Sequence, residues 1–121
     1  MKRIVLAGLV VATALAVVAL AFGATTLGIS ADKSGKLAFN KKALAAKPGK
    51  VTITMLNTQV LPHNVAIKLT KSSKKAIVTG QIVGKGKTSK VAASLKAGSY
   101  IFYCSVAGHE AGGMWGVLKV K

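Results

Sequence analysis

The sequence predicts an all-β fold, a small sandwich of about seven to eight strands, behind an N-terminal export segment. After residue 30 the chain is a series of short runs in which apolar and polar residues alternate, separated by Gly, Pro, Ser and Lys. This pattern is typical of the strands of a β-sandwich. No run in this region has the length and period of a long helix. Residues 32–121 suffice for one such domain and are too few for two.

The first element is an apolar segment, assigned to residues 1–31 as a signal peptide or an N-terminal membrane anchor. A short positive start, MKR, precedes the stretch Ile4–Gly28, which has no charged residue, and this is the pattern of a secretory signal. Cleavage is expected after Gly23 or Ala31, although the apolar stretch is also long enough to span a bilayer as an uncleaved anchor. We therefore expect residues 32–121 to form an exported domain, periplasmic or otherwise extracytoplasmic.

Strands are expected where the alternation is clearest. KVTITMLN places Val51, Ile53 and Met55 on one face and follows the Pro-Gly turn in AKPGK. SYIFYC is apolar almost throughout, as a strand buried between two sheets should be. LAAK, residues 44–47, is too short for a clear alternation and favours one helical turn. The full set of expected strands covers residues 36–40, 50–57, 63–69, 76–84, 89–95, 99–104 and 116–121.

Lysine dominates the charge of the expected domain. Removal of Lys2 and Arg3 reduces the formal net charge from +16 to +14, and the only acidic residues are Asp32 and Glu110. Such a charge either keeps a surface soluble or steers the protein toward an acidic partner or an anionic membrane. Nucleic acid is not an expected partner, because the domain has no arginine, the residue that reads bases and phosphates best. Export would also remove the protein from most nucleic acid.

Cysteine and histidine are rare in the chain and unevenly placed. Cys104 is the only cysteine, and His63 and His109 are the only histidines. A single cysteine in an exported protein cannot form an internal disulfide, so it is either a reactive leftover or has a specific task. Cys104 ends an expected strand, and His109 and Met114 follow it on a loop rich in glycine, which accepts sharp turns. At one pole of a sandwich these side chains can converge with His63.

Two imidazoles, a thiolate and a thioether form the donor set of a blue-copper electron-transfer site. The thiolate favours Cu(I), the imidazoles tolerate Cu(II), and the weak thioether helps to set the potential, whereas zinc prefers four strong ligands. Taken singly, each residue has a plainer interpretation: Met114 in a core, Cys104 as a small buried hydrophobe, the histidines at the surface. Chance placement of all four is a poorer account than a copper site.

The chain resembles the cupredoxins over roughly Lys36–Lys121. LPHNVAI and SYIFYCSVAGHEAGGMWGVLKV are similar to the two copper-binding signatures of that family, and the spacing C-x4-H-x4-M is closest to the auracyanin type. The resemblance implies that Asn64 holds a strand and a loop together and donates toward the thiolate sulfur. It also implies a Greek-key sandwich that binds one type 1 copper ion through His63, Cys104, His109 and Met114.

The function implied by the resemblance is electron transfer between redox partners, without an enzymatic reaction. The acidic patch of plant plastocyanins is absent, so their photosynthetic partner is not carried over. The lysines favour an acidic partner, such as a cytochrome or the copper domain of an oxidase, and attraction to an anionic membrane is the rival explanation. We expect a monomer in which His109 is the ligand nearest solvent. Its docking patch, unless these residues only make a tight loop, would be Leu61, Pro62, Ala107, Gly108, Gly112 and Gly113.

Other functions and roles stay open at this point. A copper storage or delivery protein would use similar ligands, but it would usually carry clusters of Met or Cys, which the three methionines do not form. A copper enzyme needs further copper sites, and no histidines remain to build one. A basic adhesive protein would explain the lysines and not the ligand set. Glu110 either tunes His109, repels wrong partners or faces water; Trp115 either covers Met114 or packs at the end of a sheet, which we favour.

Overall fold

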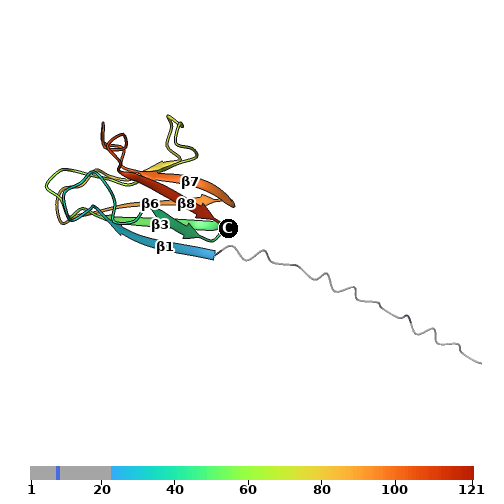
Figure 1. Ribbon diagram of the computed structural model, residues 1–121. Coiled ribbons are helices and arrows are strands. Elements are labelled where there is room, and N and C mark those ends of the chain that lie inside the picture. The colour runs from blue at the N-terminus through green and yellow to red at the C-terminus, as the bar shows by residue number, and fades with distance from the viewer. Residues whose placement is uncertain (1–7, 9–22) are drawn as a thin grey trace, which may run out of the picture.

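Two β-sheets face each other in the computed structural model, which describes residue 8 and residues 23–121 (Figure 1). The first sheet has the strand order β1-β3-β6, and the second has the order β2-β8-β7-β4-β5. β1 pairs with β3, and β2 with β8, in parallel, while the other pairs are antiparallel. The strands are β1 (Gly23–Ser30), β2 (Ala43–Ala46), β3 (Gly49–Leu56), β4 (Ala66–Lys68), β5 (Val78–Thr79), β6 (Thr88–Leu95), β7 (Gly98–Tyr103) and β8 (Trp115–Val120). The predicted Greek-key β-sandwich is confirmed.

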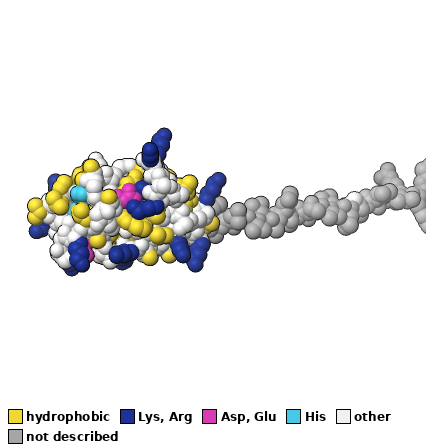
Figure 2. Space-filling model, turned by 45° about the horizontal axis from the view of Figure 1, so that its top comes forward, with side chains coloured by type: hydrophobic (Ala, Val, Ile, Leu, Met, Phe, Trp, Pro, Cys, Tyr) yellow, Lys and Arg dark blue, Asp and Glu magenta, His cyan; other side chains and the backbone are white. Residues whose placement is uncertain are grey.

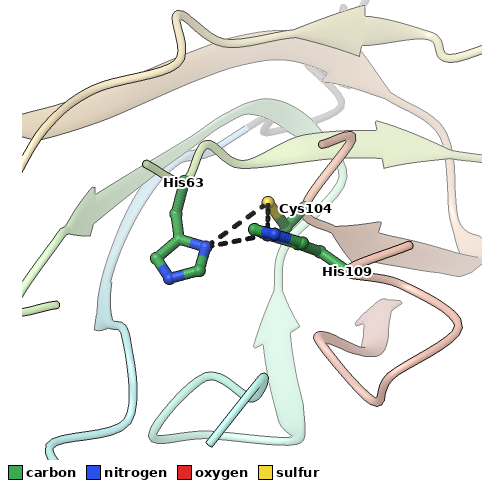
Figure 3. A group of neighbouring side chains, drawn as sticks. All are labelled: His63, Cys104 and His109. Atoms are coloured by element: carbon green, nitrogen blue, oxygen red, sulfur yellow. Dashed lines mark hydrogen bonds between the residues drawn. The ribbon is translucent and has the colours of Figure 1, made fainter. Parts of the chain in front are cut away.

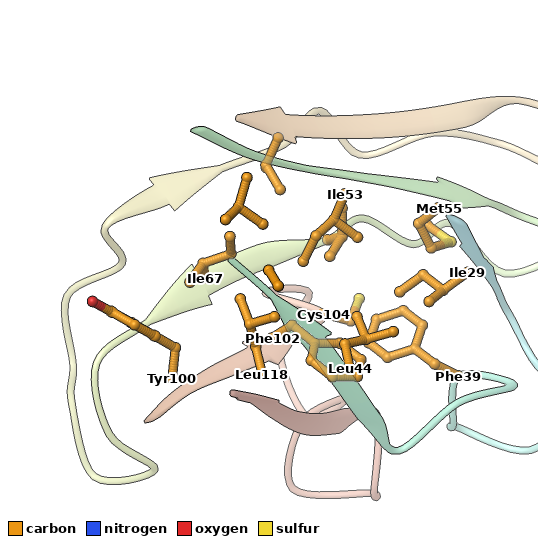
Figure 4. Close-up of a cluster of buried hydrophobic side chains, with 14 of the residues drawn as sticks. Ile29, Phe39, Leu44, Ile53, Met55, Ile67, Tyr100, Phe102, Cys104 and Leu118 are labelled. Atoms are coloured by element: carbon orange, nitrogen blue, oxygen red, sulfur yellow. The ribbon is translucent and has the colours of Figure 1, made fainter. Parts of the chain in front are cut away.

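The core lies between the two sheets and follows the alternation of the sequence. Val51, Ile53 and Met55 of β3 are fully buried, as the pattern KVTITMLN predicts. Ile53 and Met55 point toward the second sheet (Figure 4). Phe102 of β7 is fully buried opposite them and packs on Phe39 with ring centroids 5.7 Å apart. Period-two burial of this kind gives each strand one apolar face, and those faces make up most of the hydrophobic stabilisation of the domain.

Strand β7 carries apolar residues on both faces, and burial by the facing sheet explains only the inner face. Its inward residues belong to the main core, as expected for a strand buried by a facing sheet. Its outward residues Ile101 and Tyr103 form a second small cluster with Ala66, and Trp115 packs against it. A near-continuous apolar run therefore reflects cover on the outer face by neighbouring side chains, and not a third layer of structure.

The domain begins earlier than the expected boundary between residues 31 and 32. Gly23–Ser30 forms strand β1, which pairs with β3 from Gly23 beside Gly49 to Ser30 beside Leu56. The segment predicted for export, residues 1–31, includes this whole strand because residues 4–31 carry no charge, yet Ile29 is buried in the core. Cleavage after Ala31 would remove β1. The expectation of a signal peptide or anchor in residues 1–22 lies outside the described residues, apart from Gly8.

The predictions for two short segments were also wrong. Ala43–Ala46 is a strand and not a helical turn, because its backbone pairs in parallel with β8 and buries Leu44 and Ala46 on one face. This pairing outweighs the helix propensity of Ala and Leu. Residues 36–40 form no strand, and only an isolated bridge joins Ala31 to Phe39. Among the described residues, no helix is long and apolar enough to cross a bilayer.

The two ends of the sandwich differ in what they carry. β1 and β3 begin at one end, where β6 also finishes beside Gly49. From there β3 runs to Leu56, and the chain then enters the loop that carries His63. The β7–β8 connection, residues 104–114, lies at the same end as that loop (Figure 1). All candidate ligand residues therefore lie on loops at one pole.

Gly116 permits a close approach that no other residue would allow. It pairs with Phe102 across β7 and β8, and a Cβ atom at this position would clash with the Phe102 ring and lie 2.6 Å from the Lys42 carbonyl oxygen. We expect Gly116→Ala to lower the free energy of unfolding by about 1–3 kcal/mol, since overpacking displaces a core ring and backbone. Chemical denaturation measures this, and Gly84→Ala, whose surroundings are open, is the control that should change little.

Candidate metal centre

Three chemically reactive side chains meet at the loop pole. His63 lies between β3 and β4, where its backbone forms a two-way bridge with Val83. Cys104 directly follows β7, and its N–H donates to the carbonyl oxygen of Met114 at 3.0 Å. The N–H of Met114 in turn donates to the carbonyl oxygen of His109, also at 3.0 Å. These backbone bonds close the loop 104–114 into a compact turn that carries three of the four predicted ligand residues.

The donor atoms of this group are close enough to share one ion. His63 Nδ1 lies 3.0 Å from His109 Nδ1, and Cys104 Sγ lies 3.9 Å and 3.6 Å from these two nitrogens (Figure 3). All three donors lie within 4.8 Å of one another. Two imidazole nitrogens that face each other and a thiol sulfur suit a soft or borderline metal ion. The residues present therefore fit a transition metal.

The burial of the donors is unequal. His63, Cys104 and Met114 have no exposed surface, whereas His109 is half-buried. Met114 shares the main hydrophobic cluster with Cys104. Burial lowers the pKa of His63, and the nearby charge of His109 lowers it further. His63 thus favours its neutral form, the one that can bind a metal.

The thiol of Cys104 is held by the backbone around it. Burial raises the pKa of Cys104, and hydrogen bonds from the backbone N–H groups of Asn64 and Val106 oppose that shift. The raised pKa means that the thiol stays protonated without a cation beside it. A bound metal ion supplies that positive charge and favours the thiolate.

Gln59 fixes the orientation of His63, and sequence reasoning missed it. Its side-chain oxygen lies 2.7 Å from His63 Nε2, so Nε2–H donates to Gln59 and Nδ1 keeps a free lone pair toward the cluster. The Gln59 amide nitrogen donates to the carbonyl oxygens of Asp32 and Lys36. Such a partner on the outer nitrogen is what sets the tautomer of a metal-binding histidine. The available signal was a glutamine four residues before the histidine.

Asn64 braces the two loops, as the resemblance implies. Its Nδ2 donates to Ser105 Oγ at 2.7 Å and to the carbonyl oxygen of Gly80 at 3.0 Å, and its Oδ1 accepts from the N–H of Ser105 at 2.8 Å. The side chain therefore ties the His63 loop to the residue after Cys104. Donation toward the sulfur comes from the backbone N–H of Asn64 and not from its side chain.

Glu110 does not simply face water. Lys68 Nζ lies 2.8 Å from its carboxylate, and Lys71 Nζ lies 2.9 Å from it. The Lys68 side chain is only 5% exposed, and its Nζ also lies 4.5 Å from the centre of the Tyr103 ring. Burial alone would raise the pKa of Glu110, but hydrogen bonds and charges from both lysines outweigh it and lower the pKa. The ion pair ties the residue next to His109 to strand β4.

Trp115 packs at the start of β8, as favoured from the sequence. Its ring is partly buried against the outer cluster of β4 and β7, and Lys71 Nζ lies 4.4 Å from its centre. Lys71 thus contacts both Glu110 and Trp115. The outer face of the sheet and the ligand loop are joined through these contacts.

The loop glycines serve different purposes. Gly108 and Gly113 have positive φ angles of 80° and 118°, which glycine adopts without strain. The φ angle of Gly112 is not positive. Gly112 packs closely on Leu37, and a Cβ atom added to Gly112 would lie 2.7 Å from Cδ1 of Leu37. Two of the three glycines thus make the turn, and the third allows close packing.

Comparison with known proteins agrees with a copper site. Residues 26–121 match the family model described as copper binding proteins of the plastocyanin/azurin family. A plastocyanin from Nostoc punctiforme is 37% identical over 102 residues, which cover 77% of this chain and 70% of that protein.

Solved structures give the same picture. Reduced auracyanin from Roseiflexus castenholzii superposes with a TM-score of 0.71 at 26% identity, covering 82% of this chain and 99% of that one. Auracyanin A of Chloroflexus aurantiacus, a "blue" copper protein, superposes with a TM-score of 0.70 at 24% identity, covering 82% of this chain and all of that one. The second likeness concerns the fold alone.

Proposed function

Because the chain belongs to the plastocyanin/azurin family of copper-binding proteins, the cupredoxins, we propose that it is an exported carrier of single electrons. Its cofactor is copper. The proposed ligands are His63, Cys104, His109 and Met114, and no substrate is transformed. The observation that carries the proposal is the buried cluster of two imidazole nitrogens and one thiol sulfur, all within 4.8 Å, on loops braced from several sides.

Copper, when bound, supplies a one-electron Cu(I)/Cu(II) couple. The residues of the chain keep the donors in one arrangement. Gln59 holds the His63 ring, and Asn64 ties the His63 loop to Ser105. The Lys68–Glu110 ion pair restrains the loop beside His109. Because the ligands are held by contacts that do not involve the metal, little has to move when the charge of the site changes, and this favours fast electron transfer.

The proposed exit for the electron is the half-buried ring of His109. Exposed small or apolar residues adjoin the two histidines in sequence: Val60, Leu61 and Pro62 precede His63, and Ala107 and Gly108 precede His109. Val60, which the sequence analysis did not include, is 83% exposed. Such apolar residues suit brief docking, since they can be desolvated at small cost.

The first experiment loads the full chain with Cu(II) and records its optical and EPR spectra. An intense blue charge-transfer band with a small copper hyperfine splitting supports the proposal. A colourless protein, or ordinary Cu(II) signals, would mean that the sulfur is not a ligand. Storage or delivery of copper, the alternative raised by the sequence, would then be the better account.

The partner is proposed to be an acidic redox protein, a cytochrome or an oxidase copper domain. With lysines on the domain and only two acidic residues, association should be steered by charge. The second-order rate constant with an acidic cytochrome is expected to fall about tenfold or more from low to high ionic strength, because salt screens exposed charges. Stopped-flow kinetics measures this, with a basic cytochrome as control. An unchanged rate with the acidic protein would contradict steering.

Gln59→Leu is expected to weaken copper binding by about 10–100-fold, because Nε2–H of His63 loses the partner that orients the ring. The same change leaves the Asp32 and Lys36 carbonyl oxygens without their donor. Competition titration with a copper chelator measures the affinity. Gln81→Leu is the matched control, since Gln81 is exposed and is the only other glutamine. Equal affinities for both variants would exclude this role for Gln59.

The site of action is proposed to be extracytoplasmic, with the protein a monomer. Export is supported by the apolar, uncharged stretch that follows MKR. Fractionation of cells that produce the full chain, with mass spectrometry of the N-terminus, distinguishes a cleaved signal from a retained anchor.

A further inference from the structure

Four lysines that are scattered in the sequence gather at the pole opposite the metal centre. Two hollows, of about 520 and 580 Å³, lie at the start of β1, and both are bordered by Gly23 and Ala24. Two lysines line each hollow, and all four are exposed. They are Lys47, Lys50, Lys96 and Lys121.

We infer that this pole, called here the lysine pole and defined by those four residues, is the surface that rests on an anionic phospholipid membrane. The metal centre then points away from the membrane. The inference goes beyond electron transfer and does not depend on copper, because the four lysines do not belong to the site.

The position of the chain entry supports a membrane as the occupant. Gly23 directly follows the residues with the apolar, uncharged sequence of an export segment, and the Lys47 side chain lies beside Gly23. In the sequence the nearest lysine after this segment is Lys33, ten positions past Gly23. The fold thus gathers basic residues around Gly23, the first residue after the apolar segment, and the linear sequence does not show this cluster. Basic residues at this position attract anionic lipid headgroups, and each lysine is expected to raise the affinity for the membrane about fivefold.

The distribution of acidic residues supports the same orientation. The chain has two, Asp32 and Glu110, and both belong to the metal end. The carbonyl oxygen of Asp32 accepts from Gln59, the partner of His63, and Glu110 adjoins His109. β3, eight residues long, runs from the lysine pole to the His63 loop and spans roughly 25 Å. Figure 2 shows lysine side chains at the end where the chain enters the domain and a histidine side chain near the other end.

The two faces would therefore not compete. A membrane on the lysine pole leaves His109 and the apolar residues beside it open to a redox partner. An acidic protein on the lysine pole would be held far from the metal centre, which makes it the weaker explanation for these four lysines.

The test uses the lysines as reporters. The full chain is reconstituted into vesicles of phosphatidylcholine, with or without phosphatidylglycerol, and is labelled briefly with a membrane-impermeant amine reagent. Mass spectrometry then reads the labelling of each lysine. In anionic vesicles at low salt, labelling of the lysine pole is expected to fall about fivefold relative to neutral vesicles and to recover in high salt. Four exposed lysines at the metal end, Lys33, Lys36, Lys85 and Lys87, should not change.

A pair of variants completes the test. One replaces the four lysines of the lysine pole by glutamine, and the other replaces the four lysines at the metal end, so both lose the same charge. Only the first should lose its response to anionic lipid, read as protection of Lys119, which is exposed and pairs with Ser99 near the lysine pole. The inference would be overturned if both poles were protected equally, if neither pole were protected, or if only the metal end were protected. Both variants should keep the copper spectrum, so failure here is distinct from failure of the proposed function.

Discussion

Replacement of Cys104 by serine is expected to abolish the intense visible absorption of the copper-loaded protein and to convert its EPR spectrum to that of ordinary Cu(II). The sulfur lies within 3.9 Å of both imidazole nitrogens and is the only thiol in the chain. A hydroxyl binds copper weakly and cannot supply the soft, covalent donor that a blue-copper site requires. The measurement is optical and EPR spectroscopy of the two proteins at equal copper loading. A blue band that survived in the serine variant would remove Cys104 from the site.

Met114→Leu separates the role of the thioether from that of the thiol. Leucine keeps the apolar volume that Met114 fills in the main core, so a cost below about 1.5 kcal/mol in folding is expected. The blue band should persist, and the reduction potential should change, because a weak ligand tunes the copper ion without creating the band. Serine at 104 and leucine at 114 thus test two parts of the same ligand set with opposite expectations for colour.

The ligands could be predicted from the sequence because the chain is so poor in the residue types concerned. One cysteine and two histidines leave few ways to build a metal site. The strands with clear alternation, β3 and β6 above all, could be predicted for the same kind of reason: a half-buried strand must alternate. A third factor is local spacing, since Cys104, His109 and Met114 lie on a single loop.

Other parts of the fold depend on pairing that the local sequence does not reveal. β1 has only one strongly buried residue, Ile29, and its alternation is hidden within an apolar run. β2 consists of Ala and Leu, which favour a helix until the partner strand β8 is present. The contacts that brace the site are also not evident from the local sequence. Gln59 holds a histidine through its side chain, and Glu110 meets a lysine 42 positions away in the sequence. None of these follows from a periodic pattern.

Glu110→Gln is expected to lower the free energy of unfolding of the metal-free protein by about 2–3 kcal/mol. The Lys68 side chain is 5% exposed, so loss of the carboxylate leaves a nearly buried ammonium group with only the Tyr103 ring and a neutral amide beside it. Removing one partner of a fully buried pair costs about 3–5 kcal/mol, and a smaller loss is expected here because the Glu110 side chain is 23% exposed. Chemical denaturation gives the value.

A double-mutant cycle decides whether the loss of stability in Glu110→Gln comes from the unpaired charge of Lys68. Lys68→Met combined with Glu110→Gln should recover most of the lost stability, since a buried pair can be replaced by apolar packing at little cost. Lys71→Gln should cost no more than about 1 kcal/mol, because Lys71 is 45% exposed and such pairs contribute little. If the double variant is as unstable as Glu110→Gln alone, the stranded charge is not the cause. If it regains stability but its copper hyperfine splitting differs from that of the unaltered protein, the ion pair has a second effect: it holds the loop that positions His109.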